Sequence, residues 1–161
     1  MRIETHMEMD CGPDFLWCAL RSVDQFETWH PYLAAVSEDT ILCTFGDPAG
    51  TASRFEMLGC VSVDDRRRQL RISYGTRRQL RLSETYTAIR YGERSMLHHD
   101  LDGSGWTMLL LGRVLEARLL PVLVVANVSL ARLIAKSCDR SPVPGTNIHI
   151  LRPRTPRGRI P

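Results

Sequence analysis

The chain has 161 residues, a hydrophobic fraction of 43% and a formal net charge of +3 at pH 7. This length predicts one domain, and the hydrophobic fraction is sufficient for a core. From residue 139 onward there are five arginines and one aspartate, so this end carries +4 and residues 1–138 carry −1. The body of the chain is therefore not basic, which excludes a charge-driven nucleic-acid partner.

The cysteines and the N-terminus indicate a cytoplasmic protein. Five cysteines, an odd number, show neither CxxC spacing nor paired histidines at zinc-finger spacing. The first ten residues contain no apolar run of the kind found in a signal peptide. We expect reduced thiols, a cytoplasmic location, no cofactor and no metal site.

The first third of the chain predicts one strand followed by two short helices. Residues 1–9 alternate between apolar and polar side chains, as in a half-buried strand. Pro13 suits the first turn of a helix, and Asp24 can cap a second one that contains Phe26. An aromatic cluster, Trp29-His30-Pro31-Tyr32, then stops the helical pattern.

The middle of the chain predicts a series of antiparallel strands joined by turns. Apolar residues alternate with polar ones, and glycine, proline or charged pairs separate the runs. The expected strands cover residues 36–45, 51–63, 69–76, 79–90 and 94–101. A loop at 102–105 should lead into the last element.

The segment 106–140 predicts a long helix with a kink at Pro121, which cannot donate the intrahelical hydrogen bond. Its uninterrupted apolar part, residues 119–130, is shorter than the 20 or so residues of a membrane span, so we expect a core helix and no span. Three- and four-residue spacing predicts one buried stripe in its first half, made of Leu109, Leu110, Val114, Leu115, Leu119 and Leu120.

These elements predict an α+β fold in which a curved sheet of about seven antiparallel strands grips the long helix. We expect a single domain over 1–140. The remaining residues, 141–161, hold five of the nine prolines and four arginines. They predict an Arg/Pro-rich tail without fixed structure.

The opening of the chain resembles the SRPBCC or START-like helix-grip superfamily, nearest its polyketide cyclase/dehydrase family. The resemblance is carried by the strand at 3–9, Pro13, Phe15 with Trp17, and Leu20, Asp24, Phe26 and Trp29-His30-Pro31. Gly50-Thr51 resembles the glycine that begins the third strand of that family. The order of elements matches over residues 1–138.

This resemblance implies a hydrophobic small molecule bound between the sheet and the last helix. It implies a cyclase or dehydrase of secondary metabolism, acting by aldol or pericyclic ring closure, or else a non-catalytic carrier or sensor of a lipid or other apolar ligand. The family has no common catalytic motif, so it transfers no catalytic residue. A homodimer is left open.

Strand alternation points four polar side chains into the interior, namely Tyr74, Glu84, Tyr86 and His99. Glu84 is the least expected of them, because an unpaired buried carboxylate is costly. It either pairs with an arginine, takes up a proton or contacts water. His99 is suited to acid/base catalysis and a tyrosine to binding an enolate oxygen. We therefore predict His99, Glu84 and Tyr86 as catalytic residues.

The predicted substrate-binding residues are aromatic or aliphatic and are expected around the same interior: Tyr74, Trp29, Tyr32, Phe55, Met57, Leu97, Leu110 and Val114. Each also has a structural interpretation as a core residue. One bulge would reverse the alternation and turn His98, Arg71 and Arg81 inward instead. Adjacent strand residues point to opposite faces, so His98 and His99 should not bind one metal ion.

Overall fold

The computed structural model of the protein describes residues 1–45, 55–76, 78–137 and 148–151. Within these ranges, the side chains of Phe45, Phe55 and residues 148–151 lie outside the description.

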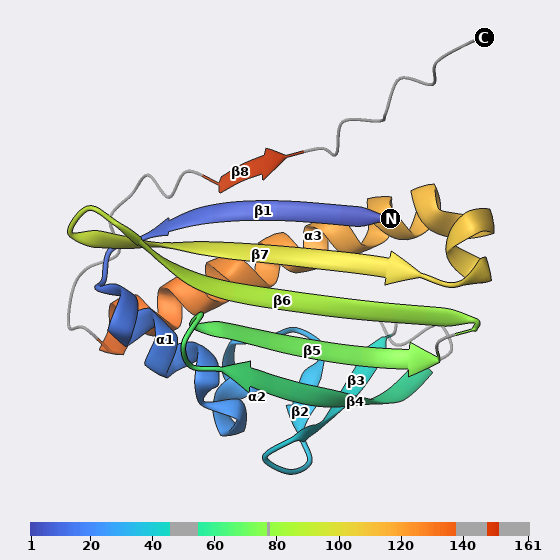
Figure 1. Cartoon of the computed structure of the whole chain (residues 1–161), viewed down its shortest axis with the longest axis horizontal. Coiled ribbons are helices and arrows are strands. Elements are labelled where there is room, and N and C mark those ends of the chain that lie inside the picture. Colours follow the sequence, from blue (N-terminus) through green and yellow to red (C-terminus); the bar gives the residue numbers. More distant parts are fainter. Residues whose placement is uncertain (46–54, 77, 138–147, 152–161) are drawn as a thin grey trace, which may run out of the picture.

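One antiparallel sheet dominates the structure, and its helices cover one face (Figure 1). After the first strand come two short helices joined by a 3-10 turn, and the long helix follows the seventh strand. In chain order the elements are β1 (Arg2–Met9), α1 (Pro13–Arg21), η1 (Val23–Gln25), α2 (Phe26–Trp29), β2 (Leu33–Ala35), β3 (Thr40–Phe45), β4 (Phe55–Asp64), β5 (Gln69–Thr76), β6 (Leu80–Tyr91), β7 (Arg94–Ser104), α3 (Trp106–Ser137) and β8 (Ile148–Leu151).

The strand order is β2-β3-β4-β5-β6-β7-β1-β8, and every neighbouring pair is antiparallel. The first strand in the sequence thus lies beside β7, next to the strand at the sheet edge. The long helix α3 crosses the face formed by β1, β7 and β6. The buried side of each long strand is mainly apolar, and buried residues largely alternate with more exposed ones, which is the pattern read from the sequence. The predicted α+β helix-grip architecture is confirmed.

Two residues set the ends of the helices that flank the sheet. Pro31 forces an extended conformation on His30 (φ −96°, ψ 124°), so α2 stops at Trp29 and the chain turns back toward the sheet. Gly105 has φ 105°, and a Cβ there would lie 2.4 Å from the carbonyl oxygen of Gln79. Only glycine fits this turn. The turn is shorter than predicted, because β7 continues to Ser104.

The long helix packs differently from the prediction in its first half. Leu109, Leu110 and Val114, expected in a buried stripe, are 88%, 72% and 56% exposed. Of the predicted stripe, Leu119 is buried, and most other buried side chains of α3 follow Pro121: Leu123, Ala126, Asn127, Leu130 and Ile134. Pro121 lies inside the helix, and the ribbon changes direction along its length (Figure 1). The core therefore covers only the second part of the predicted stripe, at Leu115, Leu119 and Leu120.

Four residues of the predicted tail belong to the sheet. β8 pairs with β1 and gives that strand, otherwise at the edge, a second neighbour. This corrects the expectation of an unstructured tail for residues 148–151. The rest of 141–161 lies outside the described residues.

None of the helices in the described part of the chain has the length and apolar character needed to cross a membrane.

Candidate functional site

A group of hydrogen-bonded polar side chains lies inside the core, around Glu84 of β6. The Glu84 side chain is fully buried (0% exposed). Its Oε1 accepts hydrogen bonds from the hydroxyls of Tyr32 and Tyr74, and its Oε2 accepts one from Tyr86 at 2.8 Å. A buried carboxylate needs such donors to offset the loss of water. Three phenols converging on one carboxylate form a specialised site rather than an ordinary apolar core.

The three tyrosines are held as hydrogen-bond donors. Burial raises the pKa of Tyr32, Tyr74 and Tyr86 well above the usual range, and the negative charge of Glu84 raises each further. All three hydroxyls therefore stay protonated at any physiological pH.

His30 enters the site because the chain turns inward after α2. Its Nε2 lies 3.1 Å from Glu84 Oε2 and 2.9 Å from the hydroxyl of Tyr86. A carboxylate only accepts, and the Tyr86 hydroxyl already donates to it, so His30 must carry its proton on Nε2. Nδ1 is buried and has no hydrogen-bond partner among the described residues.

His99 of β7 is oriented by a relay that joins three elements. The Thr5 hydroxyl donates to the carbonyl oxygen of His99 (3.2 Å) and accepts from Asn127 Nδ2 (2.9 Å). Asn127 Oδ1 is then turned toward His99 Nδ1, at 2.8 Å, and accepts a hydrogen bond from Nδ1–H. In the neutral imidazole the lone pair consequently sits on Nε2, which lies 3.7 Å from Glu84 Oε2.

Glu84 and His30 together carry one negative charge. Burial by itself would raise the pKa of the Glu84 carboxyl, but the imidazoles of His30 and His99 outweigh it and hold this pKa well below its usual range. Burial lowers the pKa of His30, and Glu84 offsets this only in part. At neutral pH the site therefore contains an ionised Glu84 beside a neutral His30.

Three buried nitrogen atoms around this group have no hydrogen-bond partner in the described part of the chain: Trp29 Nε1, His30 Nδ1 and His99 Nε2. Their rings surround Tyr86, which stacks on His99 with ring centroids 3.9 Å apart and meets Trp29 edge to face. Buried polar atoms without partners are uncommon in folded proteins and mark strained or functional sites. Here, within the described residues, Trp29 Nε1–H is a free donor, and the lone pairs of His30 Nδ1 and His99 Nε2 are free acceptors.

The structure brings together most of the residues predicted for the site. The three residues predicted as catalytic, Glu84, Tyr86 and His99, lie within this group. Three of the residues predicted to bind substrate lie beside them: Tyr74, Tyr32 and Trp29. The strand alternation that points His99 inward is confirmed, since His99 is fully buried while His98 lies on the outer face.

The other predicted binding residues do not converge. Leu97 is buried in the core. Met57 is partly buried and packs against this core. Leu110 and Val114 point to the outside of α3 because the sheet packs against the other half of that helix. The side chain of Phe55 is outside the described residues.

Sequence reasoning missed three members of the group as site residues: His30, Asn127 and Thr5. A signal existed for Asn127, since an amide inside an apolar run requires a buried partner. For His30 the signal was the following Pro31, which ends α2 and returns the chain to the sheet. Thr5 had none, because threonine is common in strands.

A hollow of about 210 Å³ lies elsewhere, between α1 and the C-terminal end of α3. Residues of both helices and of the connection after α1 line it, and none belongs to the buried polar group: Phe15, Cys18, Ala19, Ser22, Gln25, Leu133, Ile134 and Ser137.

We expect the free energy of unfolding to fall as the pH is lowered through 6.5, the ordinary pKa of histidine. The pKa of His30 is lowered by folding, so the unfolded chain takes up the proton first. The stability present above pH 6.5 is then lost by up to about 1.4 kcal/mol per pH unit until the folded pKa is reached. Urea denaturation at a series of pH values measures this slope.

The matched variant for this measurement is His30→Gln, whose slope between about pH 6.5 and pH 5 should be shallower. The comparison is needed because His98 acts in the opposite sense: the Asp100 carboxylate raises its pKa, so its contribution is lost as the pH rises. Identical slopes for the two proteins would contradict a buried neutral His30.

No protein-family model and no curated protein sequence matches the chain. Solved structures do. A protein of Thermus thermophilus superposes with a TM-score of 0.69 at 10% identity, covering 85% of this chain and 99% of its own. Norcoclaurine synthase from Thalictrum flavum, solved with dopamine and hydroxybenzaldehyde, gives 0.66 at 10% identity and covers 84% and 87%.

A third match is the Zhui aromatase/cyclase from Streptomyces sp. R1128, with a TM-score of 0.63, 16% identity, and 86% and 95% of the two chains covered. The chain has the helix-grip fold. At these identities the likeness concerns the fold, in agreement with the resemblance to the SRPBCC superfamily seen in the sequence. In this helix grip the polar group lies between the sheet strands β5 to β7 and the elements α2 and α3.

Proposed function

We propose that the protein binds a hydrophobic small molecule with carbonyl groups and catalyses its ring closure, as a polyketide-type cyclase/dehydrase does. The observation that carries the proposal is the buried group around Glu84, in which His99 Nε2 offers a lone pair and Trp29 Nε1–H a donor, neither with a partner among the described residues. Two solved proteins whose structures are similar to this chain are an aromatase/cyclase and norcoclaurine synthase.

The proposed reaction is an intramolecular aldol addition followed by loss of water. His99 Nε2 takes a proton from a C–H next to a carbonyl group, while Asn127 holds the imidazole in the required tautomer. The resulting enolate carbon forms a C–C bond with a second carbonyl carbon, whose oxygen receives the proton. A second deprotonation then expels this oxygen, with a proton, as water.

The residues around His99 would supply the electrostatic part of catalysis. Glu84 Oε2 lies 3.7 Å from His99 Nε2 and stabilises the imidazolium formed when that nitrogen is protonated. Tyr86, stacked on His99, would serve an enolate oxygen by turning its hydroxyl away from Glu84. Trp29 Nε1–H has no partner among the described residues and is free to donate to such an oxygen. Folding the substrate so that its reacting carbons meet would supply much of the rate.

A hydrophobic ligand is favoured by a second feature. The first half of α3 exposes apolar side chains close together in the sequence: Trp106, Leu109, Leu110, Leu111 and Val114. Exposed apolar groups of this extent often mark a surface that contacts ligands or partners. Leu110 and Val114, predicted as substrate-binding residues, belong to this exposed apolar surface.

The test is turnover of a linear poly-β-ketone thioester, followed by liquid chromatography and mass spectrometry. We expect a product lighter than the substrate by one water molecule. His99→Gln should reduce the rate by about 10²- to 10⁴-fold, the usual contribution of a general base. Glu84→Gln should also reduce it, and Glu93→Gln, an exposed glutamate in the turn between β6 and β7, should not.

Native mass spectrometry of the same proteins distinguishes the alternative, a non-catalytic carrier or sensor of an apolar ligand. Retained ligand in both the wild type and His99→Gln, without turnover, would replace the cyclase proposal with the carrier. Turnover that His99→Gln leaves unchanged would refute the acid/base role while leaving ring closure by substrate folding.

A further inference from the structure

The outer face of the sheet brings together a second set of titratable side chains, away from the buried group. β1 and β7 pair so that His6 lies opposite His98 and Glu4 lies opposite Asp100. Directly paired residues of antiparallel strands point to the same side. The two residues of each pair lie on strands far apart in the sequence, so they come together only in the folded sheet.

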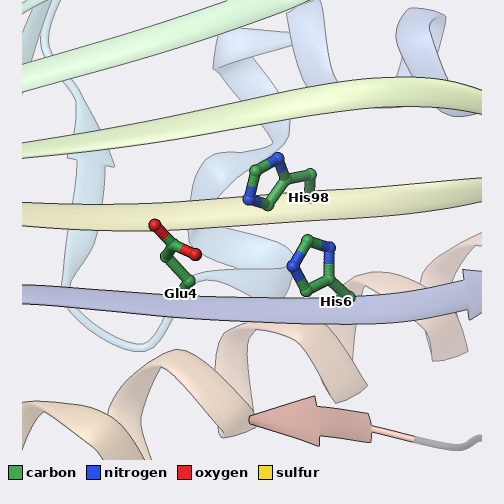
Figure 2. A group of neighbouring side chains, drawn as sticks. All are labelled: Glu4, His6 and His98. Atoms are coloured by element: carbon green, nitrogen blue, oxygen red, sulfur yellow. The ribbon is translucent and has the colours of Figure 1, made fainter. Parts of the chain in front are cut away.

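Three of these side chains offer atoms suited to a metal ion. One ligand atom each from Glu4, His6 and His98 lies within 4.8 Å of the others, and all three side chains are half-buried. Figure 2 shows the Glu4 carboxylate and the two imidazole rings turned toward a common space. The rings are stacked, with centroids 4.2 Å apart and planes 18° apart.

The carboxylate of Asp100 lies beside these three side chains and contacts His98. Its Oδ1 lies 3.2 Å from His98 Nε2, yet both atoms are buried and neither has a described partner in hydrogen-bond geometry. Two ligands of a tetrahedral Zn²⁺, each about 2.0 to 2.1 Å from the ion, stand about 3.3 Å apart. This pair is therefore already spaced like two corners of a zinc ligand shell.

We propose that Glu4, His6 and His98 bind a divalent transition-metal ion such as Zn²⁺ on the outer face of the sheet, with Asp100 as an adjacent ligand or as the carboxylate that orients His98. Two imidazoles with carboxylate oxygens are a donor set that suits zinc. Carboxylates beside a ligating histidine fix its orientation and raise its basicity.

Binding requires two local changes. The imidazole rings must turn about their terminal torsions, which are broad, so that both nitrogen lone pairs face the ion. Glu4 must also give up its contact with Arg2, whose Nε lies 2.7 Å from Glu4 Oε1 on an exposed side chain. A surface ion pair of this kind contributes little stability, so the metal can displace it.

The bound ion would fasten the first strand into the sheet. It would connect β1 to β7 on the side opposite α3, and in the backbone register β8 places a third histidine, His149, opposite His6. A ligand that binds only the folded chain adds to its stability. The site is separate from the proposed reaction, because His98 and His99 point to opposite faces.

The test is isothermal titration of the full chain with zinc chloride after removal of metals by dialysis against a chelator. We expect one Zn²⁺ per chain and a rise in melting temperature. His6→Gln and His98→Gln should each weaken binding by about tenfold or more and abolish the rise. Glu8→Gln, on the same face of β1 beyond His6, is the matched control and should bind like the wild type.

Replacing zinc with Co²⁺ identifies the ligands. Nitrogen and oxygen ligands give d–d absorption without a sulfur-to-cobalt charge-transfer band, whereas the cysteine thiols, of which Cys18 and Cys60 are exposed, would produce that band. No binding of zinc, a charge-transfer band, or an affinity unchanged in both His6→Gln and His98→Gln would overturn the proposal. The substituted residues, His6, Glu8 and His98, are on the outer face of the sheet, and circular dichroism verifies that the variants fold.

Discussion

Glu84→Ala should lower the free energy of unfolding by about 3–5 kcal/mol, because it leaves several buried donors without an acceptor at about 1–3 kcal/mol each. The substitution takes away the acceptor of Tyr32, Tyr74, Tyr86 and His30 while leaving all four groups in the core. Domains of this size are stable by about 5–15 kcal/mol, so the loss is a large fraction of the total. Urea denaturation followed by circular dichroism measures it.

Two further variants separate the loss of hydrogen bonds from the loss of charge. Glu84→Gln keeps a carbonyl acceptor and nearly the same volume, so it should cost roughly 1–2 kcal/mol. Glu93→Ala changes an exposed glutamate and should stay within about 0.5 kcal/mol of the wild type. If Glu84→Ala were as stable as the wild type, the tyrosines could not depend on the carboxylate as the structure describes.

Leu130→Ala should cost about 2–5 kcal/mol, whereas Leu110→Ala should change the free energy of unfolding by no more than about 0.5 kcal/mol. Both leucines belong to α3, but Leu130 is 0% exposed and Leu110 is 72% exposed. The same substitution in the same helix therefore differs only in burial. Paired urea denaturation curves give the difference directly.

This comparison decides which side of α3 holds the helix against the sheet. Comparable losses for both variants, or a larger loss for Leu110→Ala, would mean that the first half packs through the stripe predicted from its spacing. A large loss for Leu130→Ala alone would also leave Leu110 available as a surface contact for a hydrophobic ligand.

Strand positions and side-chain directions were predictable from the sequence because they depend on local chemistry. Alternation of period two fixes which residues of a strand share a face, so the sequence alone assigns Tyr74, Glu84, Tyr86 and His99 to the interior. Glycine, proline and charged turns located the hairpins. The helix-grip fold followed from the order of these elements and from the resemblance carried by the segment up to Pro31.

The packing of α3 was not predictable in the same way. Helical spacing identifies apolar stripes, but the first half of α3 has more apolar side chains than the sheet can cover, and spacing does not say which stripe remains exposed. Residues 148–151 likewise form a strand because β1 offers a sheet edge. Neither an edge nor the distance to it is visible in the sequence.

The sequence alone therefore determined most of the elements and the inward set of polar residues, since each depends on periodicity within a few residues, and their order indicated the fold. Only the tertiary structure decided their partners. His30 reaches Glu84 from 54 residues away, Asn127 reaches Thr5 from 122, and His98 meets His6 across two strands. Such contacts depend on strand register and helix placement, and the free energy of the whole fold sets these.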